Sequence, residues 1–118
     1  MTLTTPPKRG EIWLVDFEPQ IAEEIKKKRP AVILSIKELR HLPMRTVVPI
    51  RDHKEHHEEL FYMISLETDS KNNLSKKSSV DCSQVKAFAL KRFIKKIGEV
   101  TNDELNLIAD TASFCIGK

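Results

Sequence analysis

Apolar side chains occur in short runs along this chain, and polar loops separate one run from the next. The first run, residues 11–17, is β-branched and aromatic and follows Gly10, and it predicts a buried strand. In the second, residues 30–35, the apolar side chains are consecutive, which favours a strand covered on both faces. Further strands are expected at residues 46–50, 60–66, 78–81, 84–90 and 93–100.

Proline interrupts the run at residues 46–50. Because Pro49 has no N–H to donate to a ladder, it implies an edge position or a bulge in that strand. Between the second and third strands, residues 36–42 are expected to form one short helical turn before Pro43.

The clearest helix comes last. Thr101 and Glu104 have the spacing of a capping box, which marks a helix start. Beyond them an apolar stripe repeats at helical spacing, through Leu105, Ile108, Ala112 and Cys115. About five to seven short strands and one terminal helix predict a mainly β fold with a C-terminal helix (α+β), in which a compact barrel-like sheet packs against the helix.

The chain has 118 residues, 40% of them hydrophobic, which suits one globular domain. We expect this domain over residues 9–118, after a loose, flexible tail at residues 1–8. No apolar stretch is long enough to cross a bilayer, and the N-terminus lacks the pattern of a signal peptide, so we expect a cytoplasmic protein without membrane contact. The two cysteines, Cys82 and Cys115, form no C-x-x-C pair.

The formal charge is only +3, but the basic residues are clustered. One cluster occupies residues 26–29 and another contains Lys91, Arg92, Lys95 and Lys96. A clustered basic face can hold phosphates and steer a nucleic acid. A solvated lysine loop is the alternative interpretation of the same pattern.

Three histidines, His53, His56 and His57, share one polar segment with Asp52 and Glu58. A histidine pair can perform acid–base chemistry, and these residue types can bind metal. The segment lacks a rigid ligand spacing, so we expect a solvated loop and no metal. The three glycines are widely separated, which excludes phosphate-binding glycine loops.

Three segments carry a family resemblance. Residues 9–19 have the sequence R-G-E-I-W-L-V-D-F-E-P, residues 29–35 have R-P-A-V-I-L-S, and residues 80–86 have V-D-C-S-Q-V-K, followed by K-I-G-E-V at residues 96–100. In this order the segments resemble the MazF/PemK family of toxin ribonucleases of type II toxin–antitoxin systems. The resemblance extends from about Lys8 to the C-terminal helix.

The resemblance implies an SH3-like barrel of the CcdB/PemK toxin type. It also implies a homodimer, cleavage of single-stranded RNA without metal or other cofactor, and inhibition by a cognate antitoxin. The CcdB-type relatives poison a protein target and are not nucleases, so fold alone does not decide the activity. Two alternatives stay open: a non-catalytic toxin that binds a protein, and a degenerate member that only binds its antitoxin.

By motif position, Arg29 matches the catalytic arginine of the family and Glu24 matches its acidic residue. Arg51 falls where the family has a threonine, and Ala22 falls where a glycine is usual. The other candidate RNA contacts are Lys27, Lys28, Gln84 and Lys86.

The implied reaction uses the 2′-hydroxyl of the RNA as the nucleophile. Glu24 is the candidate base, and the guanidinium of Arg29 suits stabilisation of the phosphorane, since its planar fork grips two phosphate oxygens. Arg51 would strengthen phosphate binding, or hold substrate and product too tightly. Trp13 is assigned to the core, not to RNA stacking.

Overall fold

The computed structural model describes residues 5–17 and 28–118. This part of the chain contains seven β-strands, three short 3-10 helices and one α-helix. The strands are β1 (Glu11–Asp16), β2 (Lys28–Ile33), β3 (Met44–Asp52), β4 (Met63–Leu66), β5 (Ser78–Asp81), β6 (Lys86–Ala89) and β7 (Phe93–Glu99). The helices are η1 (Lys37–Leu39), η2 (Glu55–Glu59), η3 (Leu90–Arg92) and α1 (Asn102–Cys115). The expected mainly β fold with a C-terminal helix is confirmed.

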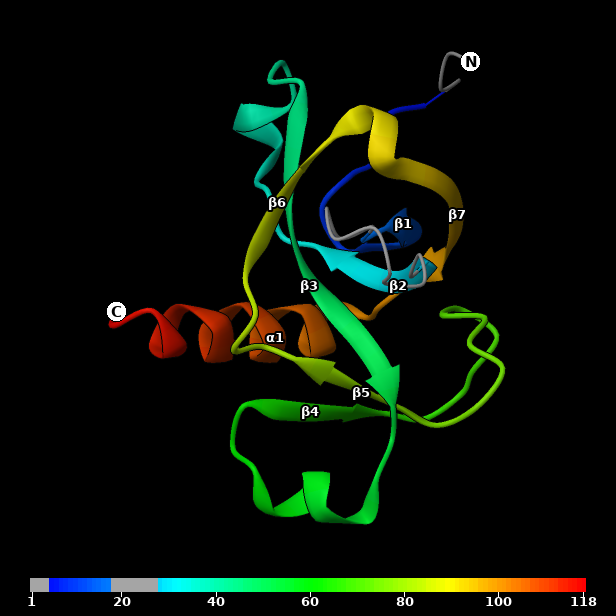
Figure 1. Cartoon of the computed structure of the whole chain (residues 1–118), viewed down its shortest axis with the longest axis vertical. Coiled ribbons are helices and arrows are strands. Elements are labelled where there is room, and N and C mark those ends of the chain that lie inside the picture. The colour runs from blue at the N-terminus through cyan, green and yellow to red at the C-terminus, as the bar shows by residue number, and fades with distance from the viewer. Residues whose placement is uncertain (1–4, 18–27) are drawn as a thin grey trace, which may run out of the picture.

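The strands form one curled antiparallel sheet in the order β4-β5-β3-β2-β1-β7, and β6 also pairs with β3. The long strand β3 lies at its centre (Figure 1). It pairs with β2 along one edge and with β6 and then β5 along the other. Because β6 borders β3 and β7 borders β1, the segment from β6 to β7 wraps around the sheet and gives it the SH3-like, barrel-like form.

Of the two positions expected for Pro49, an edge strand or a bulge, the edge strand is wrong, because β3 has partners on both sides. Along one side of β3, Pro49 faces Ala31 of β2. Along the other side, pairing with β6 ends at Val47 and pairing with β5 begins at Ile50. Proline therefore occupies the gap where β3 changes partners, and its missing N–H costs no ladder hydrogen bond there.

Two apolar clusters fill the two faces of β1, β2 and β3. One joins α1 to the sheet and contains Ile12, Val32, Val48, Ile50, Leu66, Val80, Cys82, Val100, Ile108 and Ala112. The other lies inside the curl, where it contains Trp13, Val15, Ala31, Ile33, Val47 and Phe93. Successive β2 residues alternate between the clusters, which confirms a strand covered on both faces. Trp13 of β1 is buried in the second cluster, so its assignment to the core is confirmed.

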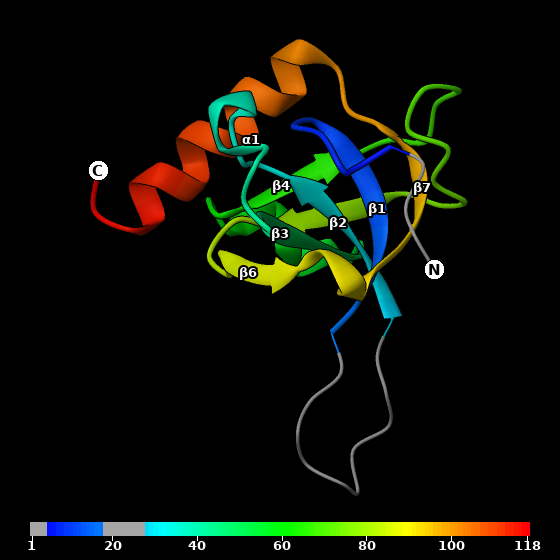
Figure 2. The same cartoon turned by 90° about the horizontal axis from the view of Figure 1, so that it is seen from above.

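The helix α1 runs along one side of the sheet (Figure 2). Its capping box is confirmed, because the Glu104 N–H donates to Thr101 Oγ1 at 3.1 Å and the Thr101 N–H donates to Glu104 Oε1 at 2.8 Å. Ile108 and Ala112 are buried, whereas Cys115 is only partly buried. No helix in the described ranges is long and apolar enough to span a membrane.

Part of the segment expected as a loose tail, residues 1–8, is fixed to the fold. Residues 1–4 lie outside the described part of the chain, but Pro7 is fully buried. Its carbonyl accepts a hydrogen bond of 2.8 Å from Arg45 Nε, which fixes this segment to the start of β3.

Candidate functional site

An open cleft of about 400 Å³ lies at one end of β2 and β3. It is lined by Lys28, Arg29, Pro30, Ile50, Arg51, Asp52 and Lys54. Four of these side chains are cationic and one is anionic. The carboxylate of Asp52 is already paired with Lys76 Nζ at 3.1 Å, so the cleft carries a positive potential that suits an anion.

The strand register brings the two arginines of the cleft together. Ala31 of β2 faces Pro49 of β3. The pairing of β2 with β3 ends at this pair, and Arg29 and Arg51 lie two residues beyond it, where both line the cleft. Two guanidinium groups that line one open cleft are an arrangement that a phosphate would stabilise.

Arg51 is held from one side by a buried carboxylate. Its Nη1 lies 3.7 Å from Oδ2 of Asp81 on the neighbouring strand β5. The side chain of Asp81 is 3% exposed, whereas that of Arg51 is 43% exposed. The guanidinium therefore has a buried ion-pair partner on one side and remains partly exposed where it lines the cleft.

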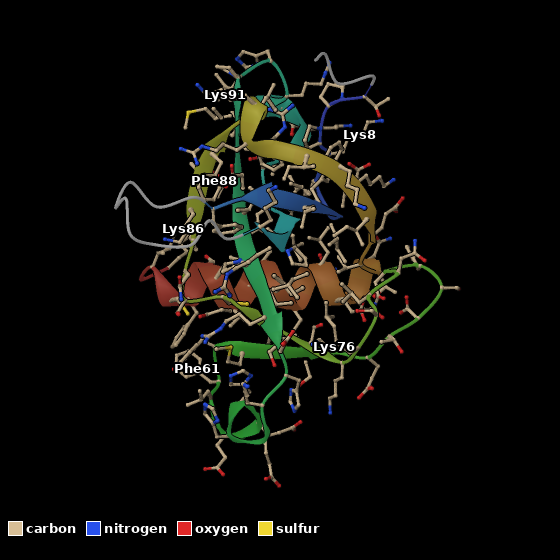
Figure 3. The ribbon with its side chains drawn as sticks, turned by 45° about the vertical axis from the view of Figure 1, so that its right-hand side comes forward. Lys8, Phe61, Lys76, Lys86, Phe88 and Lys91 are labelled. Atoms are coloured by element: carbon tan, nitrogen blue, oxygen red, sulfur yellow. The ribbon has the colours of Figure 1, made fainter. Side chains whose placement is uncertain are left out.

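The predicted site residues fall into three groups. Lys28, Arg29 and Arg51 line the cleft together. Gln84 and Lys86 lie outside its lining: Gln84 follows β5, and Lys86 is exposed on β6 beside Phe88 (Figure 3). The predicted base Glu24, the candidate RNA contact Lys27 and the departure at Ala22 lie outside the described residues.

The histidine segment is not the solvated loop that we expected. Residues 55–59 form η2, and His57 is 3% exposed. The Nδ1 atoms of His57 and His53 lie 2.9 and 3.0 Å from Oγ of Ser79. This strand residue faces Arg51 in the register of β3 and β5. The expectation was wrong because a hydroxyl distant in sequence shares its hydrogen bonds with both rings.

Burial lowers the pKa of His57, and the positive charges of His56 and Arg51 lower it further. His57 is therefore neutral at pH 7, and its Nδ1 accepts a hydrogen bond of 3.1 Å from the Lys54 N–H. Within residues 5–17 and 28–118, no three His, Cys, Asp or Glu side chains are grouped closely enough to hold a metal ion.

Cys82 adjoins the site but is not a nucleophile. It is fully buried among apolar side chains, and this burial raises the pKa of its thiol to about 12. Because the thiolate is the reactive form, the residue acts as a small core side chain.

Two residues of this site had no role in the sequence analysis. Lys54 lines the cleft, and Asp81 anchors Arg51. Asp81 was visible only as part of a family-like segment. The sequence contains one indication of a buried polar cluster, namely an aspartate at the end of a buried strand that is followed closely by Ser83 and Gln84.

The curled sheet, the terminal helix and the cleft define a small SH3-like barrel protein with a cation-lined cleft at one end of β2 and β3. Residues 8–113 match the family described as PemK-like, MazF-like toxin of type II toxin-antitoxin system. The chain belongs to this toxin family, as its sequence motifs suggested.

Individual relatives agree with this assignment. The chain is 29% identical over 104 residues to Endoribonuclease MazF9 of Mycobacterium tuberculosis (strain ATCC 25618 / H37Rv), covering 83% of this chain and 86% of the relative. Its fold is similar to that of MazF from Deinococcus radiodurans, with a TM-score of 0.76 and 17% identity, covering 97% of this chain and 99% of the other. It is also similar to a mycobacterial endoribonuclease in complex with its cognate antitoxin, with a TM-score of 0.73, 18% identity and coverage of 94% and 95%.

Proposed function

We propose that this chain is a toxin endoribonuclease that cleaves single-stranded RNA in the cleft at the end of β2 and β3. The observation that carries the proposal is the cleft itself, where Arg29 and Arg51 come from facing strands of a MazF-like toxin fold. A similar relative is named an endoribonuclease, which supports the same activity.

In the proposed reaction the 2′-hydroxyl attacks the adjacent phosphorus, and Glu24 takes its proton. The bond to the leaving 5′-oxygen breaks, and this oxygen takes a proton from solvent water, which produces a 2′,3′-cyclic phosphate and a 5′-hydroxyl end. Arg29 stabilises the charge on the phosphorane, a role in which one well-placed donor contributes about 3 kcal/mol. Arg29 is not the acid for the leaving oxygen, because the pKa of an arginine lies above about 12.

Arg51 supplies a second charge where the family has a threonine. Since Asp81 anchors one side of its guanidinium, the open side is available to a phosphate oxygen. Lys28 and Lys54 extend the positive lining along the cleft. Lys27, Gln84 and Lys86 remain proposed contacts to the flanking nucleotides.

The activity is tested by incubating the purified protein with a mixed pool of single-stranded RNA, with and without EDTA. We expect cleavage in both conditions, upstream fragments that end in a cyclic phosphate, and loss of about two orders of magnitude in rate for Arg29→Ala. Lys91→Ala is the matched control, because Lys91 is an exposed cation on η3, outside the cleft lining. Equal rates for Arg29→Ala and the wild type would refute the proposed site.

A cognate antitoxin is the proposed protein partner, with an acidic segment that covers the cleft and its four cations. Labelled RNA bound to Arg29→Ala toxin should be released when this antitoxin is added, because both ligands need the same charges. RNA that stays bound at unchanged affinity in the complex would contradict a shared surface.

The proposal also includes a cytoplasmic homodimer, an expectation that rests on membership of the family. The mass of the purified protein in solution, measured by light scattering at micromolar concentration, tests the dimer. A monomer at all accessible concentrations would contradict it.

A further inference from the structure

We propose that Asp81 is a positioning residue that couples phosphate binding by Arg51 to base recognition by Gln84. This inference rests on the proposed function of the cleft. Asp81 itself touches no substrate in the proposal, since its side chain is buried at the end of β5.

The two carboxylate oxygens of Asp81 have separate partners. Oδ1 accepts hydrogen bonds from the Ser83 N–H at 3.1 Å and from Ser83 Oγ at 2.6 Å. Oδ2 accepts a hydrogen bond of 3.0 Å from Gln84 Nε2 and lies 3.7 Å from Arg51 Nη1. Oδ1 therefore stabilises the turn after β5, and Oδ2 links Arg51 of the cleft to the exposed amide of Gln84.

Burial makes this connection effective. Asp81 is 2% exposed, so its interactions are screened less than those of a surface carboxylate. Long side chains such as Arg51 lose much rotamer freedom when they bind a ligand. An anchor that already restricts Arg51 in the free protein lowers this cost, and the same anchor restricts Gln84.

The contact also fixes the orientation of the Gln84 amide. A carboxylate can only accept hydrogen bonds, so the amide must direct its NH₂ group to Oδ2. The carbonyl oxygen Oε1 is then the acceptor that Gln84 offers to RNA. An acceptor at this position favours a base that presents an N–H donor, which is the kind of edge contact by which single-stranded RNA is recognised.

The variant Asp81→Asn tests the coupling because it is isosteric. Its amide oxygen can still accept from both Ser83 donors, which leaves an NH₂ group facing Arg51 and Gln84. We expect kcat/KM to fall about tenfold and the set of cleaved sequences to broaden. The new NH₂ group at position 81 can only donate, so it cannot accept from Arg51 or from the amide of Gln84. Ser83→Ala, which removes only an Oδ1 partner, should keep the wild-type cut sites. Asp110→Asn makes the same charge change at an exposed position of α1.

Thermal unfolding of every variant separates folding from positioning. A purely structural role would lower the melting temperature of Asp81→Asn without changing the cut sites or the rate per folded molecule. In a double-mutant cycle on the cleavage rate, Asp81→Asn should cost less in the Arg51→Ala background than in the wild type, because the part of its effect that acts through Arg51 is already lost. Fully additive losses, or wild-type rate and cut sites in folded Asp81→Asn, would overturn the inference while leaving the proposed nuclease intact.

If the wild type does not cleave RNA at all, the proposed function fails first, and RNA binding tests the coupling separately. Fluorescence anisotropy with a labelled single strand should then give a weaker affinity for Asp81→Asn than for the wild type and for Asp110→Asn. Equal affinities for all three proteins would overturn the coupling as well.

Discussion

Two cation-rich clefts lie at opposite ends of the same pair of strands, β2 and β3. The first is the proposed site, with Arg29 and Arg51. The second, also of about 400 Å³, is lined by Pro7, Lys8, Arg9, Ser35, Ile36, Lys37, Arg40 and Arg45. By size and by number of positive charges, the second cleft is an equally good candidate.

The difference lies in what the guanidinium groups already bind. Arg45 is 3% exposed. It donates to the carbonyls of Pro7, Leu42 and Met44 at 2.8 Å each and to that of Arg40 at 3.2 Å.

Arg9 and Arg40 also donate to backbone carbonyls, those of Leu34 and Lys37. In the first cleft, by contrast, the side chain of Arg29 makes no hydrogen bond or ion pair with residues 5–17 or 28–118. Charge alone therefore does not define a site. The guanidinium groups of the second cleft already bind backbone carbonyls, and these hydrogen bonds hold its segments together.

Arg45→Met gives the largest effect on stability expected from this comparison. It removes a buried cation and leaves four backbone carbonyls without their donor, which should lower the free energy of unfolding by about 3 kcal/mol. Urea unfolding at pH 7 measures the loss, with Lys37→Met as the exposed control in the same cleft. A variant as stable as the wild type would show that Arg45 is not a structural residue.

Arg51→Ala should reduce kcat/KM about thirtyfold, because it removes one of the two charges that face the phosphate. Its cost in stability should stay below about 1 kcal/mol, since the side chain is 43% exposed and its ion pair is partly screened. Single-turnover kinetics and urea unfolding measure the two quantities. A large loss of stability with an unchanged rate would place Arg51 in the same class as Arg45.

The His57 site makes stability depend on pH. Burial lowers the pKa of folded His57 below its ordinary value of 6.5, so the unfolded chain binds the proton more tightly. The corresponding stability is complete above about pH 6.5 and is lost as the pH falls from there through the folded pKa.

The free energy of unfolding of the wild type should therefore decrease more between pH 7 and pH 5 than that of His57→Asn. The charged and titratable groups around the ring, namely Arg51, His53, Lys54 and His56, are the same in both proteins. His41→Asn, at an exposed position, should follow the wild type. Parallel pH profiles for all three proteins would contradict the burial of His57.

The smallest expected effect concerns the salt dependence of RNA binding, in which Lys28→Ala and Lys37→Ala should differ. If Lys28 contacts a phosphate, its removal reduces the salt slope of RNA binding by about 0.7, the value for one contact to a single strand. Lys37→Ala, in the second cleft, should leave that slope unchanged. Anisotropy titrations at several salt concentrations test the pair, and a reversed result would exchange the roles of the clefts.

Local patterns predicted most of this fold. The buried strand at residues 11–17 and the capping box of Thr101 depend only on neighbouring residues, and both are confirmed. The edge position considered for Pro49 was wrong, because the place of this residue depends on where β6 ends and β5 begins, which is a tertiary property.

The site was only partly predictable for the same reason. Arg29 and Arg51 were proposed from the family motif, and both line the same cleft. The burial of His57 and the anchoring role of Asp81 were missed, because each depends on a partner more than twenty residues away. Sequence patterns report spacing along the chain and not hydrogen bonds across the sheet.

The most direct test of the account is to replace Arg29 and Arg45 by lysine, which keeps the charge and removes the guanidinium fork. We predict that Arg29→Lys loses at least about tenfold in single-turnover cleavage rate with unchanged stability, whereas Arg45→Lys loses stability and keeps its rate per folded molecule. Wild-type cleavage by Arg29→Lys, together with a loss of rate in folded Arg45→Lys, would contradict the placement of the active site at this end of the strands.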